Sequence, residues 1–152
     1  MSNKIRYNVV RALAVAGAFG LLAGCETMQS MMGGDKSMRG ERVALSGASE
    51  VPPSGSSASG TANVTVHEDC TVAGKVTVSG MTATAAHIHQ GAAGANGPVI
   101  VPFNKTADNT FEAASGAKMN SDQCAAYKAG NTYVNVHSAA NPGGEVRAQL
   151  KP

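Results

Sequence analysis

Short runs of alternating apolar and polar residues, separated by turn-forming residues, constrain the fold of this chain most strongly. Residues 61–67 (TANVTVH) and 71–79 (TVAGKVTVS) both alternate valine with polar or small residues. Period-two alternation is typical of a strand that buries one face. Glu68 and Asp69 lie between the two runs and favour a turn, so we expect an antiparallel hairpin.

Similar short runs of strand-forming residues continue along the chain and are separated by Gly, Pro, Asn and Ser. We expect further strands at 41–46, 84–89, 99–103, 110–114, 132–137 and 145–150. The segment 121–130 (SDQCAAYKAG) opens with capping residues and closes on Gly, which predicts one short helix. Short strands at this spacing predict an all-β sandwich or barrel.

The amino-terminal segment resembles a secretory leader. Lys4, Arg6 and Arg11 precede an uncharged run at 12–24 (ALAVAGAFGLLAG), which is too short to span a bilayer comfortably. The run ends in LLAGC, which resembles a bacterial lipobox. We therefore expect Cys25 to be lipidated and to become the first residue of the mature protein. The alternative is an ordinary signal peptide followed by an incidental cysteine.

This interpretation divides the chain into a signal peptide at 1–24, the lipidated cysteine with a flexible tether at 25–40, and a domain at 41–152. The tether is polar and contains Gly. Its methionines suit Cu(I), although methionines in a tether can also be incidental; they are Met28, Met31, Met32 and Met38.

Removal of the leader also changes the charge. It leaves nine basic and ten acidic residues, a net formal charge of −1 in place of +2. A nucleic-acid-binding surface is therefore not expected. Attachment to the membrane would come from lipid. Because Glu26 rather than Asp follows the cysteine, the sorting rule of enterobacterial lipoproteins favours the outer membrane of the bacterial envelope, with the domain facing the periplasm.

Lipidation of Cys25 would leave Cys70 and Cys124 as a pair. In an oxidising compartment two remaining thiols usually form a disulfide. Closing a loop of about 55 residues would stabilise the fold by roughly 4 kcal/mol. The alternative is a pair of unpaired or metal-binding thiols. The domain lacks Trp and has few aromatic residues, so its core must consist mainly of Val, Ala, Ile and Leu.

Three histidines fall in two of the expected strands. His87 and His89 are two residues apart, so they point to the same face about 6.6 Å from each other. His137 ends the run 133–137 (YVNVH) and shares a face with Asn135. If the two strands are neighbours, the three imidazoles can hold Zn²⁺ or Cu²⁺ with one open position, provided that their nitrogens lie within about 4 Å.

Other interpretations of the histidines stay open. Histidines in this pattern also form hydrogen bonds to loops or face the solvent. His67, at the end of the expected hairpin strand, is a weaker fourth candidate.

Two Gly-rich loops, at 91–98 and 141–144, offer a surface for a partner. The candidate binding residues are Gly91, Asn96, Gly97, Asn141, Gly143 and Gly144. The first loop lacks the lysine and the following helix of a phosphate loop. After the second loop, Glu145 and Arg147 share an outward face, and we expect them to pair. The chain contains no Gly-x-Ser-x-Gly elbow and no His-Glu-x-x-His motif, so we expect no enzyme.

Several segments together resemble the CHRD domain, which is named for chordin and occurs widely in bacterial secreted proteins. The matching segments, in order, are 45–53 (LSGASEVPP), 58–62 (ASGTA), 86–91 (AHIHQG), 97–99 (GPV), 133–137 (YVNVH) and 141–150 (NPGGEVRAQL). Gln90 and Ala148 stand where the family commonly has Gly. The resemblance implies an all-β fold, an antiparallel immunoglobulin-like β-sandwich, here with one short helix. In chordin the setting is extracellular protein interaction.

A looser similarity links the chain to copper–zinc superoxide dismutase, another β-sandwich with a His-x-His strand. A recognisable run of further metal ligands is missing here, so dismutase activity is not expected. We expect a non-enzymatic, lipid-anchored binding module with an envelope protein partner. The alternative is a periplasmic copper- or zinc-binding protein that uses His87, His89 and His137, with a redox-protective role.

Overall fold

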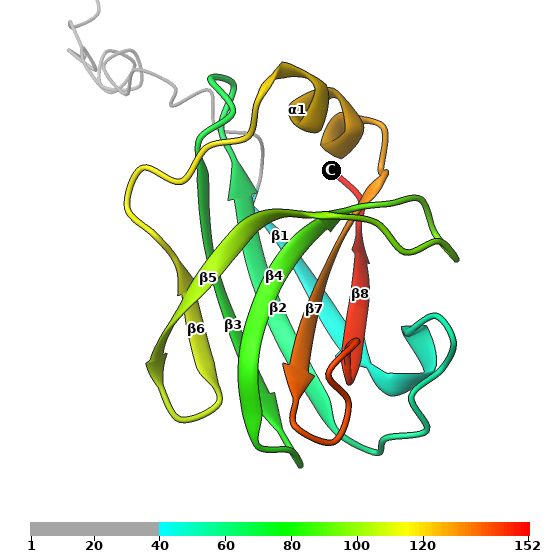
Figure 1. Ribbon diagram of the computed structural model, residues 1–152. Coiled ribbons are helices and arrows are strands. Elements are labelled where there is room, and N and C mark those ends of the chain that lie inside the picture. Colours follow the sequence, from blue (N-terminus) through cyan, green and yellow to red (C-terminus); the bar gives the residue numbers. More distant parts are fainter. Residues whose placement is uncertain (1–39) are drawn as a thin grey trace, which may run out of the picture. The chain divides into compact units, whose positions relative to one another are not determined.

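The computed structural model describes residues 40–152, which form an antiparallel β-barrel with one short helix (Figure 1). Its elements are β1 (Glu41–Ser46), the 3₁₀ turn η1 (Gly47–Ser49), β2 (Ser59–Val66), β3 (Val72–Ser79), β4 (Ala83–Gln90), β5 (Val99–Ala107), β6 (Thr110–Ala113), α1 (Ser121–Lys128), β7 (Thr132–Ser138) and β8 (Val146–Leu150). The strands predicted from the alternation are all present. The predicted leader and most of the tether, with Cys25 and the four methionines, lie outside the described residues.

The strand order around the barrel is β1-β2-β3-β6-β5-β4-β7-β8. Adjacent strands are antiparallel, and β8 meets β1 where Arg147 lies opposite Ser46. The predicted all-β antiparallel class with one short helix is confirmed. Because the strands close into a barrel, the structure does not single out the immunoglobulin-like arrangement.

Inward-facing residues of the alternating runs fill the barrel. On β2, Val64 and Val66 are fully buried, and on β3 the buried positions include Val76. Phe103 and Phe111 join them, so small aliphatic side chains with a few aromatic rings form the core, as predicted. The faces of the strands that point outward are therefore free to carry polar side chains.

The disulfide predicted between Cys70 and Cys124 is present, with Cα atoms 5.8 Å apart. It links the β2–β3 turn to α1, which connects β6 to β7 above one end of the barrel in Figure 1. The helix begins one residue earlier than its predicted caps suggested. Asn120 is the N-cap, and its side chain and that of Gln123 bond reciprocally to each other's backbone N–H at 2.9 Å.

Among residues 40–152, no helix is long and apolar enough to cross a bilayer.

Candidate metal centre

A polar surface covers the outer face of β4, β7 and β8. The register places His87 opposite Asn135, and Asn135 opposite Arg147 on the far side of β7. In the next row His89 lies opposite Tyr133. Because Ile88, Val134 and Val136 face the core, period-two alternation turns these polar neighbours outward. The two histidine strands, β4 and β7, are neighbours, as the histidine prediction required.

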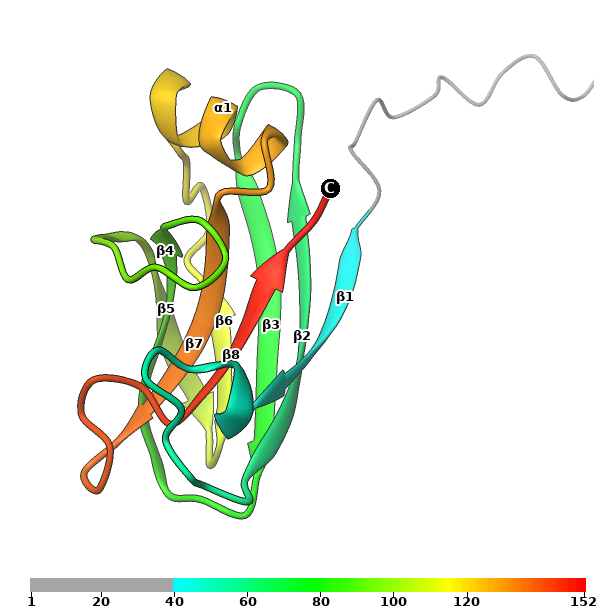
Figure 2. The same ribbon diagram turned by 90° about the vertical axis from the view of Figure 1, so that its right-hand side faces the viewer.

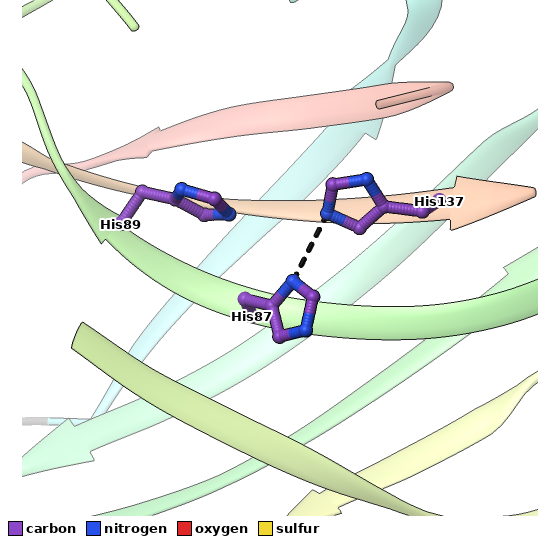
Figure 3. Close-up of side chains that lie close together, drawn as sticks. All are labelled: His87, His89 and His137. Atoms are coloured by element: carbon purple, nitrogen blue, oxygen red, sulfur yellow. Dashed lines mark hydrogen bonds between the residues drawn. The ribbon is translucent and has the colours of Figure 1, made fainter. Parts of the chain in front are cut away.

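The three predicted histidines come together on this face (Figure 3). His87 Nδ1 lies 3.0 Å from His137 Nε2. One ring nitrogen of each histidine, His89 included, lies within 4.8 Å of the others. Zinc–nitrogen bonds measure about 2.0–2.1 Å. The His87–His137 pair is therefore close enough to share an ion. The 4.8 Å limit for the whole group exceeds the separation of about 4 Å that the prediction required, so His89 must move closer to join them.

Backbone carbonyls orient two of the rings. His89 Nδ1 lies 2.9 Å from the carbonyl oxygen of Gly97, and His137 Nδ1 lies 2.9 Å from that of Pro142. A carbonyl oxygen only accepts, so both Nδ1 atoms must carry the proton and donate. The Nε2 atoms then carry the lone pairs. Hydrogen bonding of this kind commonly fixes the orientation of histidines that bind metals.

The electrostatic environment favours neutral imidazoles. Burial lowers the pKa of His87 from 6.5 to about 4, and the neighbouring charges of His137 and His89 add to the effect. Burial also lowers the pKa of His89, against an opposing contribution from its hydrogen bond to Gly97. Neutral imidazole is the form that binds a metal ion, so these rings remain competent ligands in mildly acidic solution.

His89, Tyr133 and Arg147 form a group of stacked side chains. The rings of His89 and Tyr133 are stacked, with centroids 4.9 Å apart and planes 8° from parallel. The guanidinium of Arg147 also lies over the Tyr133 ring, with Cζ 3.3 Å from the ring centroid. A cation over an aromatic face is attracted by the ring quadrupole. The stack limits how far the His89 ring can turn.

The prediction that Glu145 and Arg147 pair is wrong. Arg147 is 2% exposed and donates to the Ala95 carbonyl at 2.9 Å and to Asn96 Oδ1 at 3.1 Å. Glu145 accepts a hydrogen bond of 2.7 Å from Ser56 instead. Both side chains leave the same strand face, but the loop after β4 covers Arg147 while the segment before β2 reaches Glu145.

A family model for the CHRD domain matches residues 42–150. The chain belongs to the CHRD family. The match covers both histidine strands and the loops around them, as the resemblance of the sequence segments indicated. No curated protein matches the chain, and no solved structure matches it.

The two loops proposed to bind a partner also make contacts within the CHRD domain. In the loop after β4, Gly91 donates its N–H to the Asn131 carbonyl, and the Asn96 side chain donates to the Val51 carbonyl. Gly97 provides the carbonyl that orients His89. Both loops and the segment after η1 lie on the same side of the barrel (Figure 2).

The loop between β7 and β8 has exposed residues at its tip. Gly143 is exposed, and the Gly144 N–H donates to the Asn141 carbonyl. Between this loop and residues 50–54 lies a surface pocket of about 370 Å³, which Asn96 also lines. This pocket is adjacent to Pro142, whose carbonyl holds His137.

His67 lies apart from the three histidines. It follows β2, and within the described part of the chain it does not belong to the group whose ring nitrogens converge. The alternation of residues 133–137 predicted that Asn135 shares a face with His137, but no sequence pattern predicted a role for Tyr133 or Glu50. The alternation in 133–137 could have indicated Tyr133. No local pattern brings Glu50, on the segment after η1, to this face.

Proposed function

We propose that this CHRD protein binds a divalent transition metal ion, copper or zinc, through His87, His89 and His137. The observation that carries the proposal is the convergence of their ring nitrogens, with two of the rings held by backbone carbonyls. Three imidazoles suit Zn²⁺ and Cu²⁺ and leave a fourth position for another donor. The ion would serve metal handling or redox protection rather than catalysis by the protein.

Metal analysis of the tag-free protein tests this proposal. We expect about one ion per chain, and an added ion at about 100 times its Kd should stabilise the fold by about 2.7 kcal/mol. The variants His89→Ala and His137→Ala should lose both effects. His67→Ala is the matched control, because this histidine lies outside the group, and it should bind like the unaltered protein. A metal-free protein whose melting temperature ignores both ions would contradict the proposal.

We further propose that lipid at Cys25 anchors the protein to the bacterial envelope, on the periplasmic face of the outer membrane. The basic and apolar leader, the LLAGC sequence and Glu26 support this location. The unaltered protein should partition into detergent and sediment with outer-membrane fractions, and Cys25→Ser should do neither. Equal partitioning of the two proteins would refute the anchor.

A second candidate function is recognition of an envelope protein by the loops. The pocket of about 370 Å³ beside the β7–β8 loop favours it, together with the exposed Gly143 and Asn96. Cross-linking in intact envelopes should capture a partner that disappears when residues 139–143 are replaced. Unchanged capture by the replaced protein would remove this loop from the interface. The histidine variants separate this function from metal binding.

A further inference from the structure

Asn135 occupies the middle of the polar face. It lies on the central strand of the three, opposite His87 on β4 and opposite Arg147 on β8. Directly opposed residues in antiparallel strands have Cβ atoms about 4.5–5.5 Å apart. His137 follows two residues later and points to the same side. Asn135 is 2% exposed, so its carboxamide is shielded from solvent.

Glu50 determines which end of the carboxamide faces the histidines. The Asn135 side chain lies beside the Glu50 carboxylate and lowers the pKa of Glu50, as expected where the donor end of the amide, Nδ2, faces a carboxylate. Gly144 permits this approach, because a Cβ at that position would lie 2.5 Å from Glu50 Oε1 and 2.7 Å from Asn135 Nδ2. The carbonyl end, Oδ1, is therefore the end that remains for the histidines.

Three buried atoms around Asn135 have no hydrogen-bond partner among residues 40–152: His89 Nε2, Asn135 Oδ1 and Glu50 Oε1. The side chains of His89 and Asn135 are neighbours, since Asn135 raises the pKa of His89 against the larger lowering by burial. His89 donates its Nδ1 proton to Gly97, so its Nε2 carries a lone pair. Two neighbouring lone pairs in a buried setting are costly unless they share a proton or a metal cation. A metal ion between them would satisfy both atoms.

We propose that Asn135 Oδ1 is the fourth protein donor to the metal ion, and that the Glu50 carboxylate positions it by attracting the Nδ2 end of the amide. This inference rests on the proposed function of the three histidines. An amide oxygen is a hard donor, whereas Cu(I) prefers soft sulfur donors. The site would thus favour the divalent ions over Cu(I).

Competition titrations with a chelator test the proposal on the purified protein. Asn135→Leu should weaken Zn²⁺ binding at least tenfold, and Glu50→Gln should weaken it by roughly 10–100-fold, as loss of an outer contact does in other sites. Neither change should alter Cu(I) affinity by more than about twofold if the oxygen is a donor to divalent ions only. Asn104→Leu is the matched control, because Asn104 is exposed on β5, and it should leave Zn²⁺ affinity unchanged.

The absorption spectrum of the Co²⁺-loaded protein gives a second readout, since it reports the donor set of the ion. Asn135→Leu should change this spectrum, and Asn104→Leu should not. Asn135→Ala removes the carboxamide without adding bulk and decides the matter if the leucine variant fails to fold. If the unaltered protein binds Zn²⁺ and both Asn135 variants bind it equally well with the same Co²⁺ spectrum, Asn135 is not a ligand. If the unaltered protein binds neither Zn²⁺ nor Co²⁺, the proposed function itself fails.

Discussion

Acidification of the metal-free protein should destabilise it through His87. The pKa of this imidazole is lowered from 6.5 to about 4 in the folded state, first by burial and then by the charges of His137 and His89. Between these two pH values the unfolded chain binds a proton that the folded chain does not. Stability is therefore retained above pH 6.5 and lost as the pH falls from 6.5 to 4.

The magnitude follows from the size of this pKa difference. A difference of this size corresponds to about 3 kcal/mol, and solvent around the half-buried ring reduces the effect to about 1–2 kcal/mol. Burial raises the pKa of Glu50, so that group works in the opposite direction. Its contribution is common to the unaltered protein and to a His87 variant, and it cancels when the two are compared.

Urea denaturation in the presence of a chelator, at pH values from 4 to 7, measures the effect. The unaltered protein should lose about 1–2 kcal/mol more than His87→Gln over this range. The difference should develop below pH 6.5 and level off near pH 4. Parallel stability curves for the two proteins, or a larger loss in His87→Gln, would refute the reasoning that burial keeps this imidazole neutral.

Three further predictions concern the scaffold of the site. Cys70→Ser combined with Cys124→Ser should lower the free energy of unfolding by about 4 kcal/mol, and a loss below about 1 kcal/mol in urea denaturation would contradict the chain-entropy argument. Arg147→Met should lower the free energy of unfolding by about 2–3 kcal/mol, because the Ala95 carbonyl and Asn96 lose their charged donor. Proteolysis within residues 91–97 should become faster, and an unchanged cleavage rate would argue that Arg147 does not hold this loop. Gly144→Ala should cost at least about 2 kcal/mol, since the residue has φ 137° and a Cβ there would collide with Glu50. Gly143→Ala, where a Cβ meets open space, should change stability by less than about 0.5 kcal/mol in the same thermal melts.

Local sequence patterns predicted the strands well because each strand buries one face. The valines of 61–67 and 71–79 faced the core as the alternation required. The spacing of His87 and His89 placed both on one outer face. Their proximity to His137 depends on β4 lying beside β7, and this pairing could not be predicted from the local sequence. Strand order arises from packing of the whole barrel, and no single segment encodes it.

The side chains around the histidines were harder to foresee for the same reason. Arg147 looked like an outward residue of β8, yet the loop after β4 closes over it and buries it. Glu50 arrives from the segment after η1, far from the histidines in sequence. A charged residue on the outer face of a strand ordinarily meets water. Only the three-dimensional course of the loops makes these positions buried.

A crystal structure of the protein soaked in Zn²⁺ or Cu²⁺, with data collected at the absorption edge of the metal, would decide whether the histidines form a metal centre. We expect one anomalous peak per chain, about 2.0–2.1 Å from nitrogens of His87, His89 and His137. In that structure the His87–His137 hydrogen bond should be replaced by bonds to the ion. A fully soaked crystal in which His87 Nδ1 and His137 Nε2 are still 3.0 Å apart, with no anomalous peak between the three histidines, would contradict the proposed function.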